Sequence, residues 1–136
     1  MPELDVAREL LVLAEEDARA LEVMLQSGQL PRRICGFHAQ QTVEKALKAW
    51  LILLDIDYPL THSLYTLLSL LRGAGADCAR YEALERLSPY AVQLRYGVGS
   101  AGAQVDPADL MPAVVDLVAH VRQLLDAADA ADSEER

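Results

Sequence analysis

The polar side chains best placed for chemistry gather in residues 32–51, RRICGFHAQQTVEKALKAWL. This stretch holds both lysines of the chain, one of its three histidines and its one tryptophan. Since an α-helix turns by about 100° per residue, a helix here carries a single stripe of His38, Gln41, Lys45 and Lys48, with Gln40 and Glu44 on its flanks. Such a stripe offers an imidazole, an amide and two ammonium groups to an anion, for example a nucleotide phosphate or an RNA backbone.

The same stripe also fits an ordinary solvated helix surface. Glu44 and Lys48 are four residues apart in the orientation that favours an ion pair, which alone stabilises a helix by about 0.3 kcal/mol. The composition favours a dedicated surface, because no lysine lies elsewhere in the chain. Both interpretations stay open.

A catalytic alternative starts from Arg33 and His38, which have four residues between them. An Arg followed by a His at four to six intervening residues occurs in one family of metal-independent ribonucleases. There the imidazole would exchange a proton with the ribose 2′-hydroxyl, and the guanidinium would stabilise charge on the phosphorus centre. On one helix, however, the two side chains point about 140° apart.

Three further residues are candidates outside this stretch. His62 lies at the start of a predicted helix, where it either caps and packs or directs a polar group at the basic stripe. Arg95 and Tyr96 precede a glycine-rich linker, where Arg95 either complements a helix dipole or joins Tyr96 in binding an anion.

Metal and cofactor sites are not predicted. The histidines are scattered without carboxylates at ligand spacing, and GVGSAG lacks the setting of a phosphate-binding loop. Cys35 and Cys78 fit no metal-ligand spacing, and we expect buried free thiols.

Composition narrows the function classes. The chain has 136 residues and a formal net charge of −9, which argues against nucleic-acid binding through the whole surface but allows a local basic patch. The sequence has neither a signal-peptide pattern nor an apolar run long enough to span a bilayer. We therefore expect a soluble, cytoplasmic protein.

The elements that would position these residues are all helical. Apolar residues recur at helical spacing over residues 3–27, 31–55, 62–75, 78–96 and 106–128. Pro89 is expected to divide the fourth segment. The predicted core includes Leu13, Val23 and Leu54, and the predicted apolar side of the last segment consists of Leu110, Val114, Leu117, Val118, Val121 and Leu125. Residues 1–128 thus form one domain, an all-α, up-and-down bundle of four to five helices, and residues 129–136 an acidic, disordered tail.

Residues 35–71 resemble the signature of the HEPN domain (higher eukaryotes and prokaryotes nucleotide-binding). The signature helix reads aromatic-x-x-Gln-Gln-x-x-Glu-Lys-x-x-Lys-Ala and is followed by Pro-x-x-His-x-Leu. The later LRYG resembles an Arg-Tyr pair near the end of that family's next helix. The matching positions are Gln41, Glu44, Lys45, Lys48, His62, Leu64, Arg95 and Tyr96.

The resemblance implies a helical bundle that is commonly a homodimer, often encoded beside a minimal nucleotidyltransferase in toxin–antitoxin-like pairs. Some members are ribonucleases with an Arg-x4–6-His motif late in the domain, and others bind nucleotides or RNA without catalysis. Here no histidine follows Arg95 before His120, so the expected catalytic histidine is missing.

Three functional hypotheses follow, in order of preference. The first is a nucleotide-, RNA- or partner-binding module that contacts its ligand through His38, Gln41, Glu44, Lys45, Lys48, His62, Arg95 and Tyr96. The second is a metal-independent ribonuclease toxin that draws its catalytic residues from Arg33, His38, His62 and Arg95. The third is a structural helical dimer without a ligand.

Overall fold

The computed structural model describes residues 2–92 and 105–135. Its elements are α1 (Leu4–Ser27), α2 (Arg32–Leu53), α3 (Leu64–Gly73), the 3₁₀-helix η1 (Ala79–Leu87) and α5 (Pro107–Glu134). Residues 90–92 are helical as well, and the described part of the chain contains no β-strand. The predicted all-α class is confirmed.

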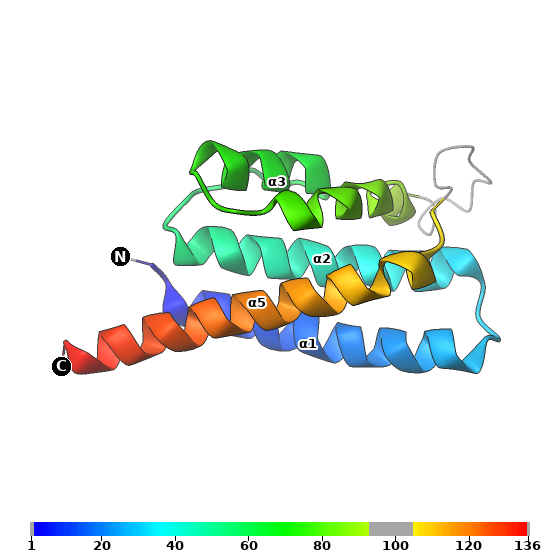
Figure 1. Ribbon diagram of the computed structural model, residues 1–136, viewed down its shortest axis with the longest axis horizontal. Coiled ribbons are helices and arrows are strands. Elements are labelled where there is room, and N and C mark those ends of the chain that lie inside the picture. Colours follow the sequence, from blue (N-terminus) through cyan, green and yellow to red (C-terminus); the bar gives the residue numbers. More distant parts are fainter. Residues whose placement is uncertain (1, 93–104, 136) are drawn as a thin grey trace.

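The long helices α1, α2 and α5 lie side by side, and α3 and η1 cover α2 on the side away from α1 (Figure 1). Gly28 ends α1 in the left-handed conformation, with φ 66°, which glycine adopts without steric cost. The chain therefore reverses within a few residues into α2. The two ends of the chain lie at the same end of the bundle (Figure 1).

The core is built mainly from leucine, alanine and valine. Every apolar residue predicted to face the core from α5 is buried: Leu110, Val114, Leu117, Val118, Val121 and Leu125. The prediction is wrong for Leu13, Val23 and Leu54, which are exposed. The buried side of α1 is a narrow line of small and medium side chains, namely Ala7, Leu11, Ala14, Ala18 and Leu21, because its neighbours α2 and α5 cover only part of its circumference.

The segment after η1 is held against α2 by one aromatic ring. Tyr90 is 1% exposed, and its hydroxyl donates to the Val105 carbonyl at 2.6 Å. The ring packs directly on Gly36, where a Cβ atom would lie 2.3 Å from Tyr90 Cδ1. Only glycine at position 36 therefore leaves room for this ring.

The predicted helix over residues 78–96 differs from the structure. Ala79–Leu87 is a 3₁₀-helix, and a turn at Ser88 and Pro89 separates it from the helical residues 90–92. The expected division at Pro89 is thus present, since proline lacks the backbone donor that a continuous helix needs.

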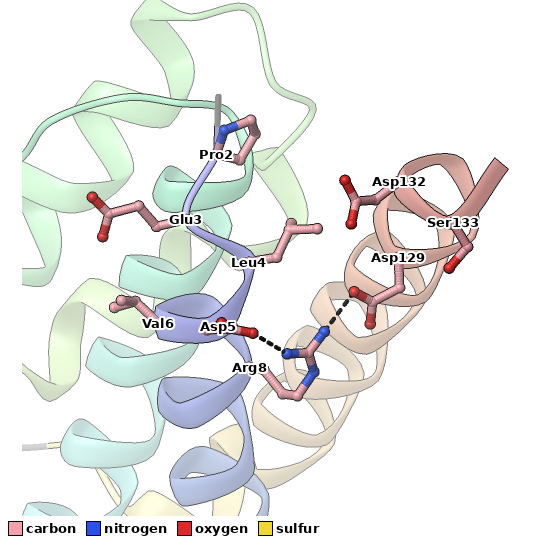
Figure 2. A pocket seen from close by; sticks show the side chains of 9 residues that line it. All are labelled: Pro2, Glu3, Leu4, Asp5, Val6, Arg8, Asp129, Asp132 and Ser133. Atoms are coloured by element: carbon pink, nitrogen blue, oxygen red, sulfur yellow. Dashed lines mark hydrogen bonds and ion pairs between the residues drawn. The ribbon is translucent and has the colours of Figure 1, made fainter. Parts of the chain in front are cut away.

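The predicted disordered tail from residue 129 also differs from the structure, because α5 continues to Glu134. Four of the eight residues from 127 to 134 are alanines, which have the highest helix propensity. Asp129 also accepts a hydrogen bond from Arg8 of α1 at 2.5 Å. Figure 2 shows this contact, with Asp5 on the other side of the Arg8 guanidinium. The division of the chain into domain and tail stays a prediction.

Both cysteines are buried free thiols, as expected. Burial raises the pKa of each thiol, which keeps both protonated and unreactive near neutral pH. Within the described residues, no helix combines the length and the apolar character that a membrane span requires.

Candidate functional site

Glu44 is the centre of a polar network on the outer side of α2. Its side chain is only 7% exposed, and three donors reach the carboxylate. Gln40 Nε2 lies at 2.9 Å, Lys48 Nζ at 3.0 Å and His62 Nδ1 at 2.9 Å. A carboxylate accepts hydrogen bonds at both oxygens, and here Oε1 serves Gln40 and His62 while Oε2 serves Lys48.

Helix geometry explains how these residues meet. Gln40, Glu44 and Lys48 are spaced four residues apart on α2, which brings them onto one face. His62 comes from the segment that joins α2 to α3, and its carbonyl accepts a second hydrogen bond from Gln40 Nε2 at 3.0 Å. Gln41 Nε2 donates to Gln40 Oε1 at 2.7 Å. We call Gln40, Gln41, Glu44, Lys48 and His62 the Glu44 network.

The network keeps Glu44 ionised. Burial alone would raise the pKa of this carboxyl, but the hydrogen bonds from Gln40, His62 and Lys48, with the charge of Lys48, outweigh it and lower the pKa. A buried charge is retained in this way only where partners compensate for the lost water. Glu44 is therefore a fixed negative charge at neutral pH.

The Tyr58 ring makes a cation–π contact with Lys48, whose Nζ atom lies 5.6 Å from the centre of the ring. Burial and the nearby charge of Glu44 raise the pKa of the Tyr58 hydroxyl. The sequence interpretation missed this residue, since Tyr58 falls in a turn before Pro59 and carries no periodic signal.

His62 is the exposed member of the network. Its side chain is 57% exposed, although its Nδ1 atom is held by the buried Glu44. Because an ionised carboxylate only accepts, Nδ1 carries the hydrogen, and in a neutral ring Nε2 is then the acceptor. No residue in the described part of the chain occupies Nε2.

Lys45, the other lysine of the predicted stripe, points to a different helix. Its Nζ atom lies 2.5 Å from Asp17 Oδ2 on α1, and both side chains are 24% exposed. Asp17 was not predicted as a partner, because a single sequence does not show which face of residues 3–27 borders the second helix. Each lysine of the chain thus has a carboxylate partner.

Of the remaining predicted residues, His38 and Arg33 are described by the structure, and neither contacts the Glu44 network within the described residues. The His38 ring contacts Phe37 edge-on at 5.6 Å between centroids, and the His38 carbonyl accepts from Thr42. Arg33 is exposed on the first turn of α2, and Arg95 and Tyr96 lie outside the described residues. The roles of these four residues stay predictions.

A second polar cluster lies where α2, η1 and α5 meet. The His120 ring packs on Trp50 at 4.9 Å between centroids, and the Tyr81 hydroxyl donates to Asp116 at 2.8 Å. Burial and the charge of Arg80 lower the pKa of His120, while burial and Asp116 raise the pKa of Tyr81 to about 12. These shifts keep both rings uncharged inside the bundle, which is a packing role.

Metal ligands do not come together in the described part of the chain, where no three His, Cys, Asp or Glu side chains form a group that could hold an ion.

Residues 7–127 match the family model of the HEPN domain. The chain belongs to the HEPN-domain family. The match covers all helices described above except the ends of α1 and α5, and at the level of the family it makes the chain a nucleotide- or RNA-related module. No curated protein and no solved structure matches the chain.

Within this HEPN domain, the Glu44 network gives the signature residues a structural explanation. The sequence predicted Glu44 and Lys48 as an ion pair and singled out His62 on its own, and the structure joins all three through one carboxylate. Lys45 belongs to the α1–α2 contact instead.

Proposed function

We propose that this HEPN domain is a nucleotide- or RNA-binding module and that His62 is the centre of its contact surface. One observation carries the proposal: a buried, ionised Glu44 holds an imidazole that is itself 57% exposed. An exposed ring contributes little to the core, so its fixed position suits recognition of something outside the chain.

Stability alone does not explain the network. Burying a carboxylate costs several kcal/mol, and an apolar side chain of similar size often serves a fold as well or better (about 1–4 kcal/mol). Glu44 is buried despite this cost, and its carboxylate orients Lys48 and His62 through hydrogen bonds. The result is an exposed imidazole and a mostly covered ammonium group, both in defined positions.

These side chains match nucleotide chemistry. A neutral His62 accepts at Nε2 from a ribose hydroxyl or a base amino group, and a protonated ring donates to a phosphate. Lys48 has three donor hydrogens, of which one is directed at Glu44. Since Glu44 balances the charge of Lys48, binding here depends on directed hydrogen bonds, in keeping with the net charge of −9.

The test is the binding of a fluorescein-labelled single-stranded RNA, followed by anisotropy at low salt without divalent cations. We expect His62→Ala and Lys48→Met to weaken binding about tenfold each, the loss of one charge-assisted contact. Gln123→Ala, which removes an exposed polar side chain from α5, is the matched control. Equal affinities for wild type and His62→Ala would refute the proposal.

A metal-independent ribonuclease is the second candidate, favoured by the Glu44–His62 pair. A carboxylate on Nδ1 orients an imidazole so that Nε2 can take a proton, as in other base-orienting pairs. Lys48, bound to the same carboxylate, would then face the phosphate.

Incubation of RNA with the protein in EDTA distinguishes binding from cleavage. Cleavage that is lost in His62→Ala and reduced in Glu44→Gln would make the domain a ribonuclease. The variants His38→Ala and Arg95→Ala test the catalytic residues predicted from the sequence. RNA that stays intact at high protein concentration would refute the ribonuclease and support the binding module.

We propose further that the domain is a homodimer and works with a minimal nucleotidyltransferase in a toxin–antitoxin-like pair, as the resemblance implies. The acidic charge of the chain supports a basic protein partner, because opposite charges speed encounter. Light scattering of the purified protein and co-purification with a genomically adjacent nucleotidyltransferase test the two parts.

A further inference from the structure

A groove of about 480 Å³ lies between the start of α3 and the end of η1. Its lining residues are Ser63, Tyr65, Glu85, Arg86, Ser88, Pro89 and Val105. Ser63 follows His62 in the chain, so the groove borders the segment that carries the imidazole. The volume lies in the range of small-molecule sites, about 300–1,000 Å³.

Hydrogen-bond donors line one part of the groove. Arg86 is exposed, and no carboxylate in the described residues pairs with it, whereas Arg8, Arg72, Arg80 and Arg122 all have acidic partners. Ser88 Oγ accepts from the Leu64 backbone N–H at 3.1 Å, which leaves the hydroxyl hydrogen for a ligand. An unpaired guanidinium beside a free hydroxyl hydrogen suits a phosphate.

An aromatic ring lines another part. Tyr65 is 59% exposed, and the Arg72 guanidinium lies 5.7 Å from the centre of its ring. Arg72 is itself held by Glu82 at 3.3 Å and by Ser69 at 2.9 Å. Arg72, from the same helix, therefore holds the Tyr65 ring in place, and a nucleic-acid base can stack on an exposed aromatic ring of this kind.

Glu85 completes the set as the acidic residue of the groove. A carboxylate accepts hydrogen bonds from the adjacent hydroxyls of a ribose, a group that inorganic phosphate lacks. The groove therefore combines an aromatic surface, an acceptor and phosphate donors within the space of one nucleotide.

From this combination we infer that the groove binds one nucleotide unit, with the base on Tyr65, the ribose at Glu85 and the phosphate at Arg86 and Ser88. The inference rests on the proposed nucleotide or RNA binding and names the ligand class of that surface. The shared chemistry is a nucleoside 5′-phosphate, and its source is either a free mononucleotide or one residue of a single-stranded RNA.

Two probes distinguish these sources: adenosine 5′-monophosphate in calorimetry and fluorescein-labelled hexa-adenylate in anisotropy. We expect Tyr65→Ser and Arg86→Gln to weaken binding of the recognised probe about tenfold, and Tyr65→Phe to bind within about twofold of wild type, because stacking needs the ring and not the hydroxyl. Arg19→Gln is the matched charge control, since Arg19 is exposed on α1. Inorganic phosphate should not compete at equal concentration.

The outcomes separate this inference from the proposed function. Binding that is lost in His62→Ala but unchanged in Tyr65→Ser and Arg86→Gln would refute nucleotide binding in the groove and would support the proposed function at His62. Failure of wild type to bind either probe overturns both. Equal weakening by Arg19→Gln and Arg86→Gln overturns the groove as well, because binding would then follow total charge.

Discussion

Glu44 is the residue on which the candidate site depends, because the positions of Lys48 and His62 both follow from its carboxylate. The donors around Glu44 favour a negatively charged side chain at this position. If the carboxylate became an amide, its nitrogen would replace one of the two acceptor oxygens. Either Lys48, or Gln40 together with His62, would then face another donor.

We therefore expect Glu44→Gln to lower the free energy of unfolding by about 1–3 kcal/mol, the usual cost of leaving buried hydrogen-bonding groups unsatisfied. Urea denaturation followed by circular dichroism measures the change. Glu16→Gln, at an exposed position of α1, is the control and should be neutral. An unchanged midpoint for Glu44→Gln would mean that the network is not formed in solution.

The pH dependence of stability follows from the lowered pKa of Glu44. In the unfolded chain this carboxyl has a pKa of about 4.3, so unfolding takes up a proton when the pH lies between the two values. The contribution of Glu44 is therefore complete above the unfolded pKa and is lost as the pH falls through the folded pKa. Denaturation series from pH 7 to pH 3 should show a shallower decline for Glu44→Gln than for wild type.

The sequence was informative about this site to a limited extent. Glu44, Lys48 and His62 could be selected because their types and spacing are unusual in an acidic chain. Asp17 and Tyr58 could not, since their roles depend on which helix faces lie together and on where a turn returns to the bundle.

At the scale of elements, the contact between Gly36 and Tyr90 fixes how the chain after η1 packs on α2. A Cβ atom at position 36 would overlap the Tyr90 ring, with the closest approach at 2.3 Å. The ring cannot move outward freely, because its hydroxyl is bound to the Val105 carbonyl.

Gly36→Ala should destabilise the domain by about 1–3 kcal/mol, as overpacking of a filled core does, even though alanine favours helix more than glycine. Gly73→Ala is the matched control, since a Cβ atom there meets nothing within 4 Å. Thermal unfolding compares the two. A more stable Gly36→Ala would show that Tyr90 does not pack on α2.

The helices themselves were largely predictable, and their exceptions have physical causes. Periodic apolar residues indicated α1, α2, α3 and α5, and glycine and proline marked most of their ends. The 3₁₀ form of η1 was not predicted, because the same apolar spacing suits either helix type. The exposure of Leu13 and Val23 depends on how many neighbours α1 has, which periodicity does not report.

At the scale of the whole molecule, the two ends of the chain are tied by Arg8, which contacts Asp5 on α1 and Asp129 on α5. The groove beside this contact is lined by both terminal segments (Figure 2). The ion pair with Asp129 attaches the last turns of α5, which follow the buried Leu125, to α1.

Arg8→Gln should therefore speed amide hydrogen exchange in residues 126–134 and leave residues 107–121 unchanged, because the latter are held by buried valines and leucines. Exchange measured by mass spectrometry at low salt gives the comparison, with Arg19→Gln as the control. High salt should reduce the difference between wild type and Arg8→Gln. Uniform exchange along α5 in both proteins would contradict this account.

The pairing of both lysines has a consequence for covalent labelling. Lys45 and Lys48 are the only side-chain amines of the chain, and each is mostly covered while it binds a carboxylate. Reagents that acylate amines should therefore modify these positions slowly in the folded protein and quickly once it opens. The rate of acylation at two adjacent turns of α2 thus becomes a measure of local opening, and a ligand at His62 would slow it at Lys48 first.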